Sequence, residues 1–111
     1  MGGDLFEIER ARPAAVYDPH SPDFEREEIA DRRAVLRFFR AERRPVAVGG
    51  LVYDPVQGCH TRESDLAYVD GGWGWTTADA YLFRLYGLKL DPEFVRYAAS
   101  AVANPAPNPS L

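Results

Sequence analysis

Residues 70–75, Asp-Gly-Gly-Trp-Gly-Trp, constrain the fold more than any other segment because they hold both tryptophans of the chain. The Asp-Gly-Gly sequence predicts a hairpin turn, since glycine readily adopts the positive φ angles of short hairpin turns. Residues 66–69 and 73–75 are then antiparallel strands on either side of it. Alternate side chains of a strand share a face, so Trp73 and Trp75 should point the same way.

Three segments have patterns typical of helices. Asp23 is a candidate N-cap for the first, Thr76 or Thr77 for the second, and Asp91, followed by proline, for the third. Gly87 is placed to end the second helix in a left-handed conformation. The predicted helices are residues 24–40, about residues 78–86, and the segment that begins at residue 92 and runs through Val102.

A second strand region precedes the tryptophan segment. Residues 46–53 are rich in β-branched side chains, and Gly49-Gly50 in their middle predicts a bulge or a turn within the strand. Residues 54–58 have the composition of a turn. The polar residues 59–65 are expected to form a loop, and the loose alternation over residues 5–10 allows a short strand.

These elements predict a single α+β domain over residues 1–103, with a small antiparallel sheet packed against about three helices. Prolines punctuate residues 11–23, which we expect to form an irregular arm. The tail, residues 104–111, alternates proline with small polar residues and is expected to be disordered.

Composition excludes several classes of function. The chain has 111 residues, a net charge of −4 and no Lys/Arg excess, which argues against a nucleic-acid partner. Its single cysteine excludes a disulfide framework and a multi-cysteine zinc site, and favours a cytoplasmic location. No apolar run approaches the roughly 20 residues that span a bilayer, and no signal peptide is visible. We therefore expect no cofactor, no metal and no membrane association.

The tryptophans have two alternative roles. With Tyr68 and Asp70 they would form a rigid aromatic surface for a partner or a flat ligand, since Trp and Tyr are frequent at binding hot spots. Alternatively both rings fill the core beneath the last two helices. The core role is favoured, because a domain this small needs its large aromatic side chains for its own core.

Arginines follow one side of the first predicted helix. Arg26, Arg33, Arg37 and Arg40 fall within a narrow arc at 100° per residue. This stripe is a candidate docking face for an acidic protein surface or for phosphates. The competing interpretation is a solvated face whose arginines pair with acids from elsewhere in the fold, and the 17 acidic residues of the chain favour it.

Cys59-His60, with Glu63 and Asp65 nearby, is a candidate metal or nucleophile site. One cysteine and one local histidine are too few for a metal, and His20 lies in a distant part of the sequence. Adjacent residues also give no assurance that the histidine faces the thiol. An exposed loop is the favoured interpretation.

The C-terminal third resembles a signature of small bacterial proteins. The signature comprises Asp-Gly-x-Trp-x-Trp, a Tyr-rich helix, a glycine turn and a final short helix, which correspond here to residues 70–75, 80–82, 86–88 and 91–94. This chain has Tyr81-Leu82 where the commoner pattern has a Tyr-Tyr pair. The resemblance brings no established activity and therefore implies no catalytic residue.

The sequence thus favours a non-enzymatic protein that binds another protein, as an accessory or immunity-like factor. Its predicted binding residues are Trp73, Trp75, Tyr68, Asp70, Arg33, Arg37 and Arg40. The alternative is a small ligand-binding domain or enzyme with an aromatic pocket near Tyr68, Trp73 and Trp75, with Tyr53 as a further lining residue. A homodimer is also open, because the first helix is apolar over a wide arc that includes Leu36, Phe38 and Phe39.

Overall fold

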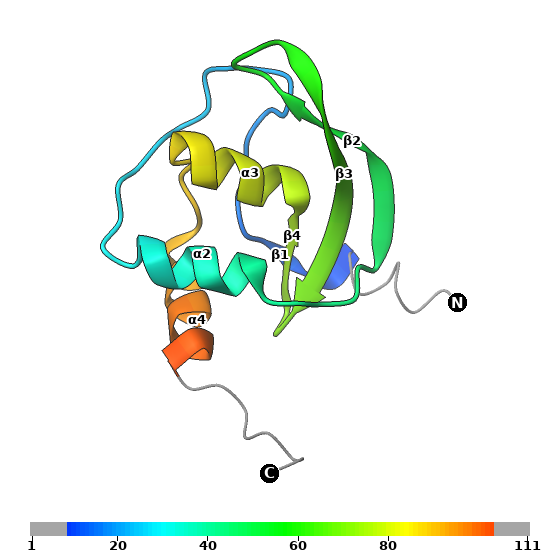
Figure 1. The fold of residues 1–111 in the computed structure, drawn as a ribbon. Helices are drawn as coiled ribbons and strands as arrows, with labels where there is room; N and C mark the ends of the chain where they lie inside the picture. Colours follow the sequence, from blue (N-terminus) through cyan, green and yellow to red (C-terminus); the bar gives the residue numbers. More distant parts are fainter. Residues whose placement is uncertain (1–8, 104–111) are drawn as a thin grey trace.

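The computed structural model describes residues 9–103, which form one sheet and three helices. In chain order the elements are β1 (Arg12–Pro13), α2 (Arg32–Arg40), β2 (Ala47–Asp54), β3 (Cys59–Asp70), β4 (Trp73–Thr76), α3 (Thr77–Tyr86) and α4 (Pro92–Ala103). The strand order is β1-β4-β3-β2, and the two-residue β1 runs parallel to β4 whereas the other pairs are antiparallel. The helices lie on one side of the sheet (Figure 1), which confirms the predicted α+β class.

The β3–β4 hairpin forms at the predicted Asp-Gly-Gly turn. Gly71 and Gly72 have φ angles of 58° and 83°, and the ladder closes with Asp70 opposite Trp73. A Cβ atom added at Gly71 would lie only 2.1 Å from the hydroxyl oxygen of Tyr97. The backbone angle therefore favours glycine at this position, and any side chain there would also displace the Tyr97 ring of α4.

β2 and β3 form a long antiparallel hairpin. Their register shifts between Val48 and Leu51, which confirms the irregularity predicted at the glycine pair. The loop predicted for residues 59–65 is wrong, because these residues are the first half of β3. Most of their side chains are exposed, so this half of the strand lacks the apolar alternation by which a strand is recognised.

The first helix is shorter than predicted. α2 begins at Arg32 after Asp31, so the prediction of helix from residue 24, with Asp23 as its N-cap, is wrong. The preceding segment instead runs alongside the α3–α4 connection, where Arg26 and Leu88 form an isolated antiparallel bridge. The backbone N–H of Glu27 donates to the carbonyl oxygen of Gly87, and that of Lys89 donates to the carbonyl oxygen of Glu25. These two hydrogen bonds replace those that a helix would have supplied.

The predicted termini of α3 and α4 are confirmed. Thr76 caps α3 in a capping box with Asp79, and Gly87 ends the helix with a φ angle of 73°. Ahead of α4, the backbone N–H of Glu93 donates to Asp91 Oδ1 at 2.8 Å, as expected for a capping aspartate.

The segments outside these elements bear on three further predictions. The strand predicted for residues 5–10 lies mainly outside the described residues, and its last two residues, Glu9 and Arg10, are helical. The predicted tail of residues 104–111 also lies outside them. Within the arm of residues 11–23, only β1 is regular. None of the described helices is long and apolar enough to cross a membrane.

The core fills the space between the sheet and the helices. The ring of Phe38 on α2 lies 5.1 Å from Trp75 and 5.6 Å from Phe94, measured between ring centroids. Phe38 is only 1% exposed, so this part of the helix face considered for a homodimer is covered by the chain's own core. The other buried members of the cluster are Ala14, Phe24, Val35, Trp73, Leu82, Phe83, Leu88, Leu90, Val95 and Ala98.

Candidate functional site

The two tryptophans point to the same face of β4, as predicted, and that face is the interior. Trp73 is 6% exposed and Trp75 is 4% exposed. Trp75 lies against Phe38, and Trp73 lies 5.5 Å from Phe94. Neither ring is therefore available as an exposed platform in this conformation, and both serve the core.

Tyr68 and Asp70 sit on β3 directly opposite the tryptophans. The half-buried Tyr68 ring stacks on Trp75 with centroids 5.9 Å apart. Asp70 accepts a hydrogen bond from Tyr97 at 3.1 Å and lies 3.8 Å from the guanidinium of Arg43. Of these two predicted site residues, Asp70 is thus engaged within the fold, whereas Tyr68 keeps one side exposed.

Arg43 joins α2 to the tryptophan layer and was not predicted from the sequence. Its guanidinium lies 4.0 Å from the Phe38 ring centroid and 5.1 Å from that of Trp75. Its Nη1 donates to the carbonyl oxygen of Phe38 at 2.5 Å. The available signal was its position just beyond a helix C-terminus, where basic side chains commonly satisfy the last carbonyl groups.

Arg33, Arg37 and Arg40 project from α2 into solvent and are called the arginine face below. Within residues 9–103 none of the three forms an ion pair or a side-chain hydrogen bond. In this part of the chain no acidic side chain therefore neutralises them. Arg26 does not belong to this face, because it precedes the helix and lies over the Phe24 ring at 4.6 Å.

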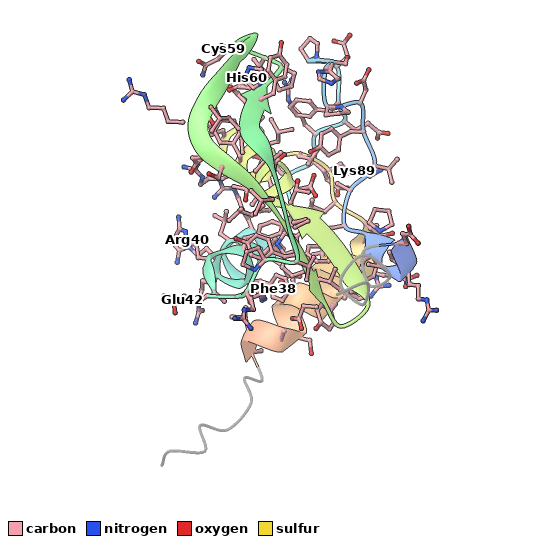
Figure 2. All side chains as sticks on the ribbon, turned by 90° about the vertical axis from the view of Figure 1, so that its right-hand side faces the viewer. Phe38, Arg40, Glu42, Cys59, His60 and Lys89 are labelled. Atoms are coloured by element: carbon pink, nitrogen blue, oxygen red, sulfur yellow. The ribbon has the colours of Figure 1, made fainter. Side chains whose placement is uncertain are left out.

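Arg40 separates two hollows in the surface and points away from the sheet in Figure 2. The smaller, of about 110 Å³, is lined by apolar and aromatic groups together with Arg84 and Glu63. The other is an open depression on the far side of Arg40, to which Arg43, Arg44 and Tyr68 contribute. The structure thus brings two predicted site residues, Arg40 and Tyr68, to one surface, on which Arg40, Arg43 and Arg44 outnumber the single acid, Glu42.

The predicted aromatic pocket does not form as one cavity. Tyr68 and Trp75 line a mainly apolar groove of about 210 Å³, to which Trp73 and Tyr53 do not contribute. This volume is below the roughly 300 Å³ at which ligand pockets begin. Tyr53 lies elsewhere, near the far end of the β2–β3 hairpin.

That end of the hairpin gathers both histidines of the chain. The ring of Tyr53 lies 5.0 Å from His60 and 5.7 Å from His20. Figure 2 shows Cys59 and His60 at the tip of the hairpin, far from Arg40. In the described part of the chain, no group of three or more Cys, His, Asp or Glu side chains is arranged to hold a metal ion.

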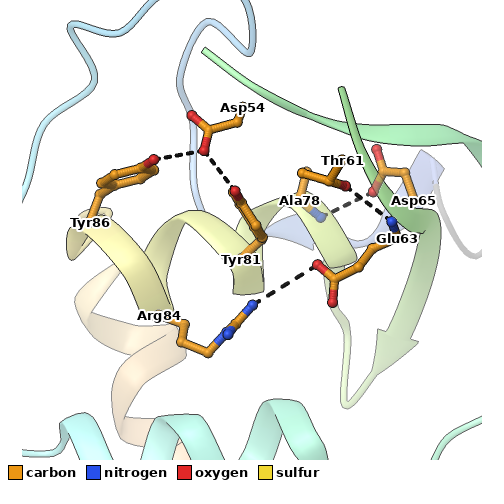
Figure 3. Close-up of polar contacts among 8 residues, drawn as sticks. All are labelled: Asp54, Thr61, Glu63, Asp65, Ala78, Tyr81, Arg84 and Tyr86. Atoms are coloured by element: carbon orange, nitrogen blue, oxygen red, sulfur yellow. Dashed lines mark hydrogen bonds and ion pairs between the residues drawn. The ribbon is translucent and has the colours of Figure 1, made fainter. Parts of the chain in front are cut away.

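A buried carboxylate, Asp54, anchors the hairpin to α3 and was missed by the sequence interpretation. It is 0% exposed and accepts hydrogen bonds from the hydroxyls of Tyr81 at 2.7 Å and Tyr86 at 2.6 Å (Figure 3). Two backbone N–H groups of the turn donate to its other oxygen. Burial alone raises the pKa of Asp54, but these hydrogen bonds outweigh it and hold the pKa below its ordinary value.

Asp79 forms a second buried polar contact, which links the N-terminal arm to α3. Tyr17 donates to its Oδ1 at 2.5 Å, while Oδ2 accepts from the backbone N–H of Thr76. Burial raises the pKa of Asp79 to about 6, against the opposing effect of these hydrogen bonds and with a smaller contribution from the charge of Asp65. Burial and Asp79 in turn raise the pKa of Tyr17, so its phenol stays a hydrogen-bond donor.

Asp79 should make the protein less stable as the pH rises from about 4 to about 7. Its folded-state pKa of about 6 lies above the ordinary value of about 3.9, so folding favours the protonated carboxyl. That stabilisation is complete below about pH 4 and is lost as the pH rises through 6. Each unit of difference between the folded and unfolded pKa corresponds to about 1.4 kcal/mol, so the free energy of unfolding should fall by about 2–3 kcal/mol in total. Denaturant titrations at several pH values measure it.

The control for this pH dependence is Asp79→Asn, which keeps the shape of the side chain without a titrating group. We expect a lower baseline stability, because the amide has one acceptor oxygen in place of two. Its free energy of unfolding should vary less than that of the wild type between pH 4 and 7. An unchanged slope in Asp79→Asn would assign the pH dependence to another group.

Comparison of the chain with models of known protein families, with curated proteins and with solved structures finds no significant match.

Proposed function

We propose that this protein is a non-enzymatic binding factor whose arginine face docks on an acidic surface of a protein partner. The observation that carries the proposal is the absence, among the described residues, of any carboxylate paired with Arg33, Arg37 or Arg40. An accessory or immunity-like role is part of the same proposal and rests on analogy with small bacterial binding proteins. A cytoplasmic location belongs to the same proposal, since it rests on the single cysteine.

The electrostatics of α2 support a partner rich in carboxylates. Arg33 and Arg37 are spaced i,i+4, and Arg37 and Arg40 are spaced i,i+3, so each pair repels by about 0.2–0.5 kcal/mol in an isolated helix. A carboxylate on a partner relieves this repulsion and forms a charge-assisted, bidentate hydrogen bond with a guanidinium. The overall charge of −4 makes the arginine face a local exception in an acidic chain, and such a patch orients an approaching acidic protein.

The surroundings of Arg40 add contact area to the charge. Phe39 and Tyr68 are both partly buried, and both line the depression beside Arg40. Arginine next to tyrosine and other aromatic side chains is the composition typical of binding hot spots. The depression beside Arg40, of about 600 Å³, is open to solvent and does not enclose a ligand, and this openness suits the surface of a protein partner better than a small ligand, which is usually held in a cleft.

The test compares two double charge reversals with the partner that co-purifies with the full chain from its native host. Arg37→Glu/Arg40→Glu alters the arginine face, and Arg62→Glu/Arg96→Glu makes the same change of net charge at two exposed arginines on β3 and α4. We expect the first variant to weaken binding by about tenfold or more, and the second by less than about threefold. The affinity of the wild type should also fall as salt is added.

Both variants should stay folded, because all four side chains are exposed. Arg37→Glu/Arg40→Glu should melt somewhat earlier than the control variant, because it places two negative charges in the last turn of α2, so binding is compared at a temperature where both variants are folded. Equal binding by all three proteins would refute the proposal. So would an equal loss in both variants, because net charge rather than the arginine face would then govern binding.

A further inference from the structure

The outer edge of β2 is not paired with any segment in the described part of the chain. β2 is the last strand in the sheet order, and Figure 1 shows it at the side of the sheet away from the helices. Two apolar side chains are exposed on it, Val48 at 72% and Leu51 at 49%. An unpaired edge offers backbone N–H and C=O groups that readily pair with another strand.

This edge lacks most of the features that prevent such pairing. β2 contains no proline, and its one charged residue, Asp54, is buried at the last position of the strand, although charges and prolines commonly protect edge strands. β1, at the opposite edge, is only two residues long and is therefore too short to pair with a strand of another chain. The protection that β2 does have is its glycine bulge, which limits how long an added ladder can be.

The bulge also places the two exposed apolar side chains on one face. Their partners on β3, Leu66 and Ser64, are two residues apart and therefore point to the same face of the sheet. Val48 and Leu51 are three residues apart, and the extra residue of the bulge restores them to that shared face. A regular strand would have set them on opposite faces.

We propose that β2 pairs antiparallel with β2 of a second copy of the chain, about a two-fold axis between Gly49 and Gly50. In this register Val48 of each copy lies opposite the partner's Leu51. Both contacts then fall on the same face of the joined sheet, which makes the edge complementary to itself. A second copy fits better than an unrelated strand, because an uncharged edge offers nothing that selects a partner of opposite charge.

The size of the contact predicts a weak dimer. One short, bulged strand per copy and two apolar pairs are well below the roughly 1,200 Å² at which stable interfaces begin. We therefore expect a dissociation constant between about 10 μM and about 1 mM. This surface is separate from the arginine face, so the two proposals succeed or fail independently.

Sedimentation equilibrium of the full chain, from about 10 μM to about 2 mM, tests the dimer. The mean mass should rise from monomer towards dimer over this range. Val48→Lys should remain monomeric, because a lysine on the edge opposes pairing. Val56→Lys is the matched control, since Val56 is 42% exposed in the turn beyond β2, and it should dimerise like the wild type. A wild type that stays monomeric at about 2 mM would overturn the proposal.

Disulfide trapping tests the register. Two proteins, Val48→Cys and Leu51→Cys, each also carrying Cys59→Ser, are mixed under oxidising conditions at a concentration where the wild type dimerises. Directly opposite residues have Cβ atoms about 5 Å apart, so the mixture should cross-link far faster than Val48→Cys alone. Equal cross-linking of both samples, or none, would exclude this register.

Hydrogen exchange separates the second copy from other occupants of the edge. The amides of residues 48–52 should become more protected as the dimer forms. Protection that is already complete in the monomer would mean that another segment of the same chain covers the edge, and would overturn the proposal. Arg37→Glu/Arg40→Glu should leave the dimer unchanged, whatever it does to binding of the acidic partner.

Discussion

Trp75→Ala is expected to lower the free energy of unfolding by about 3–5 kcal/mol, the usual cost of removing a large aromatic side chain from a core. The ring is 4% exposed and lies 5.1 Å from Phe38 and 5.8 Å from Phe94, measured between centroids. It therefore connects the sheet to both α2 and α4. Small domains are stable by only about 5–15 kcal/mol, so the variant should be close to unfolding at room temperature.

Chemical denaturation followed by far-ultraviolet circular dichroism measures this loss. Val16→Ala is a suitable control, because Val16 is 87% exposed and its truncation should cost less than about 0.5 kcal/mol. Trp75→Phe should fall between the two, since it retains an aromatic ring in a smaller volume. If Trp75→Ala were within about 1 kcal/mol of the wild type, the ring would not be a core residue and a binding role would regain support.

The tryptophan hairpin and the helix boundaries around it were predictable because their signals are local. The turn at Gly71, the end of α3 at Gly87 and the start of α4 after Asp91 each depend on a backbone preference or a cap within a few residues. Such preferences hold whatever the rest of the chain does. The direction in which both tryptophans point followed from strand alternation alone.

The errors arose where a distant segment decides the local structure. Residues 24–31 have a helical pattern, yet the bridge between Arg26 and Leu88 holds part of them against a segment about sixty positions later. The first half of β3 is a strand because β2 pairs with it, and its exposed side chains give no apolar signal. Propensity is outweighed in both places by backbone pairing that a single sequence does not display.

The candidate site was predictable only in part. The arginines of α2 were identified by helical spacing. Arg40 and Tyr68 line one depression because the residues that follow α2 lie beside β3. The buried contact between Tyr17 and Asp79 joins residues 62 positions apart, and no local pattern marks either as a partner of the other. The exposed edge of β2 was likewise invisible until the strand order was known.

Asp54→Ala is expected to destabilise the protein by about 3–5 kcal/mol, comparable with the loss of a core aromatic ring. The alanine leaves the hydroxyls of Tyr81 and Tyr86 and two backbone N–H groups without their acceptor at a fully buried position. Each unsatisfied buried donor costs about 1–3 kcal/mol, although the costs are not additive because local rearrangement admits water. Because Asp54 ends β2, the hairpin should loosen from α3.

Three matched variants distinguish this anchoring role from a general effect of removing a carboxylate. Tyr81→Phe and Tyr86→Phe each remove one donor and should cost about 1 kcal/mol, since a typical hydrogen bond contributes about 0.5–1.5 kcal/mol and one to a charged group somewhat more. Asp18→Ala removes an exposed carboxylate that also accepts from a backbone N–H, and it should cost less than about 1 kcal/mol. An equal effect of Asp18→Ala and Asp54→Ala would contradict the anchoring role.

The difference in free energy of unfolding between the wild type and Asp54→Ala should depend on pH, which a loss of packing alone would not cause. The pKa of Asp54 is lower in the folded protein than its ordinary value, so folding favours the ionised carboxylate. The stabilisation is present above about pH 4 and is lost as the pH falls through the folded-state pKa. The difference in free energy of unfolding between wild type and Asp54→Ala should therefore become smaller in acid. Asp79 has the opposite effect on the wild type, whose stability it lowers as the pH rises above about 4. A difference that stays constant down to about pH 2 would mean that the shape of the side chain, rather than its charge, holds the hairpin to α3.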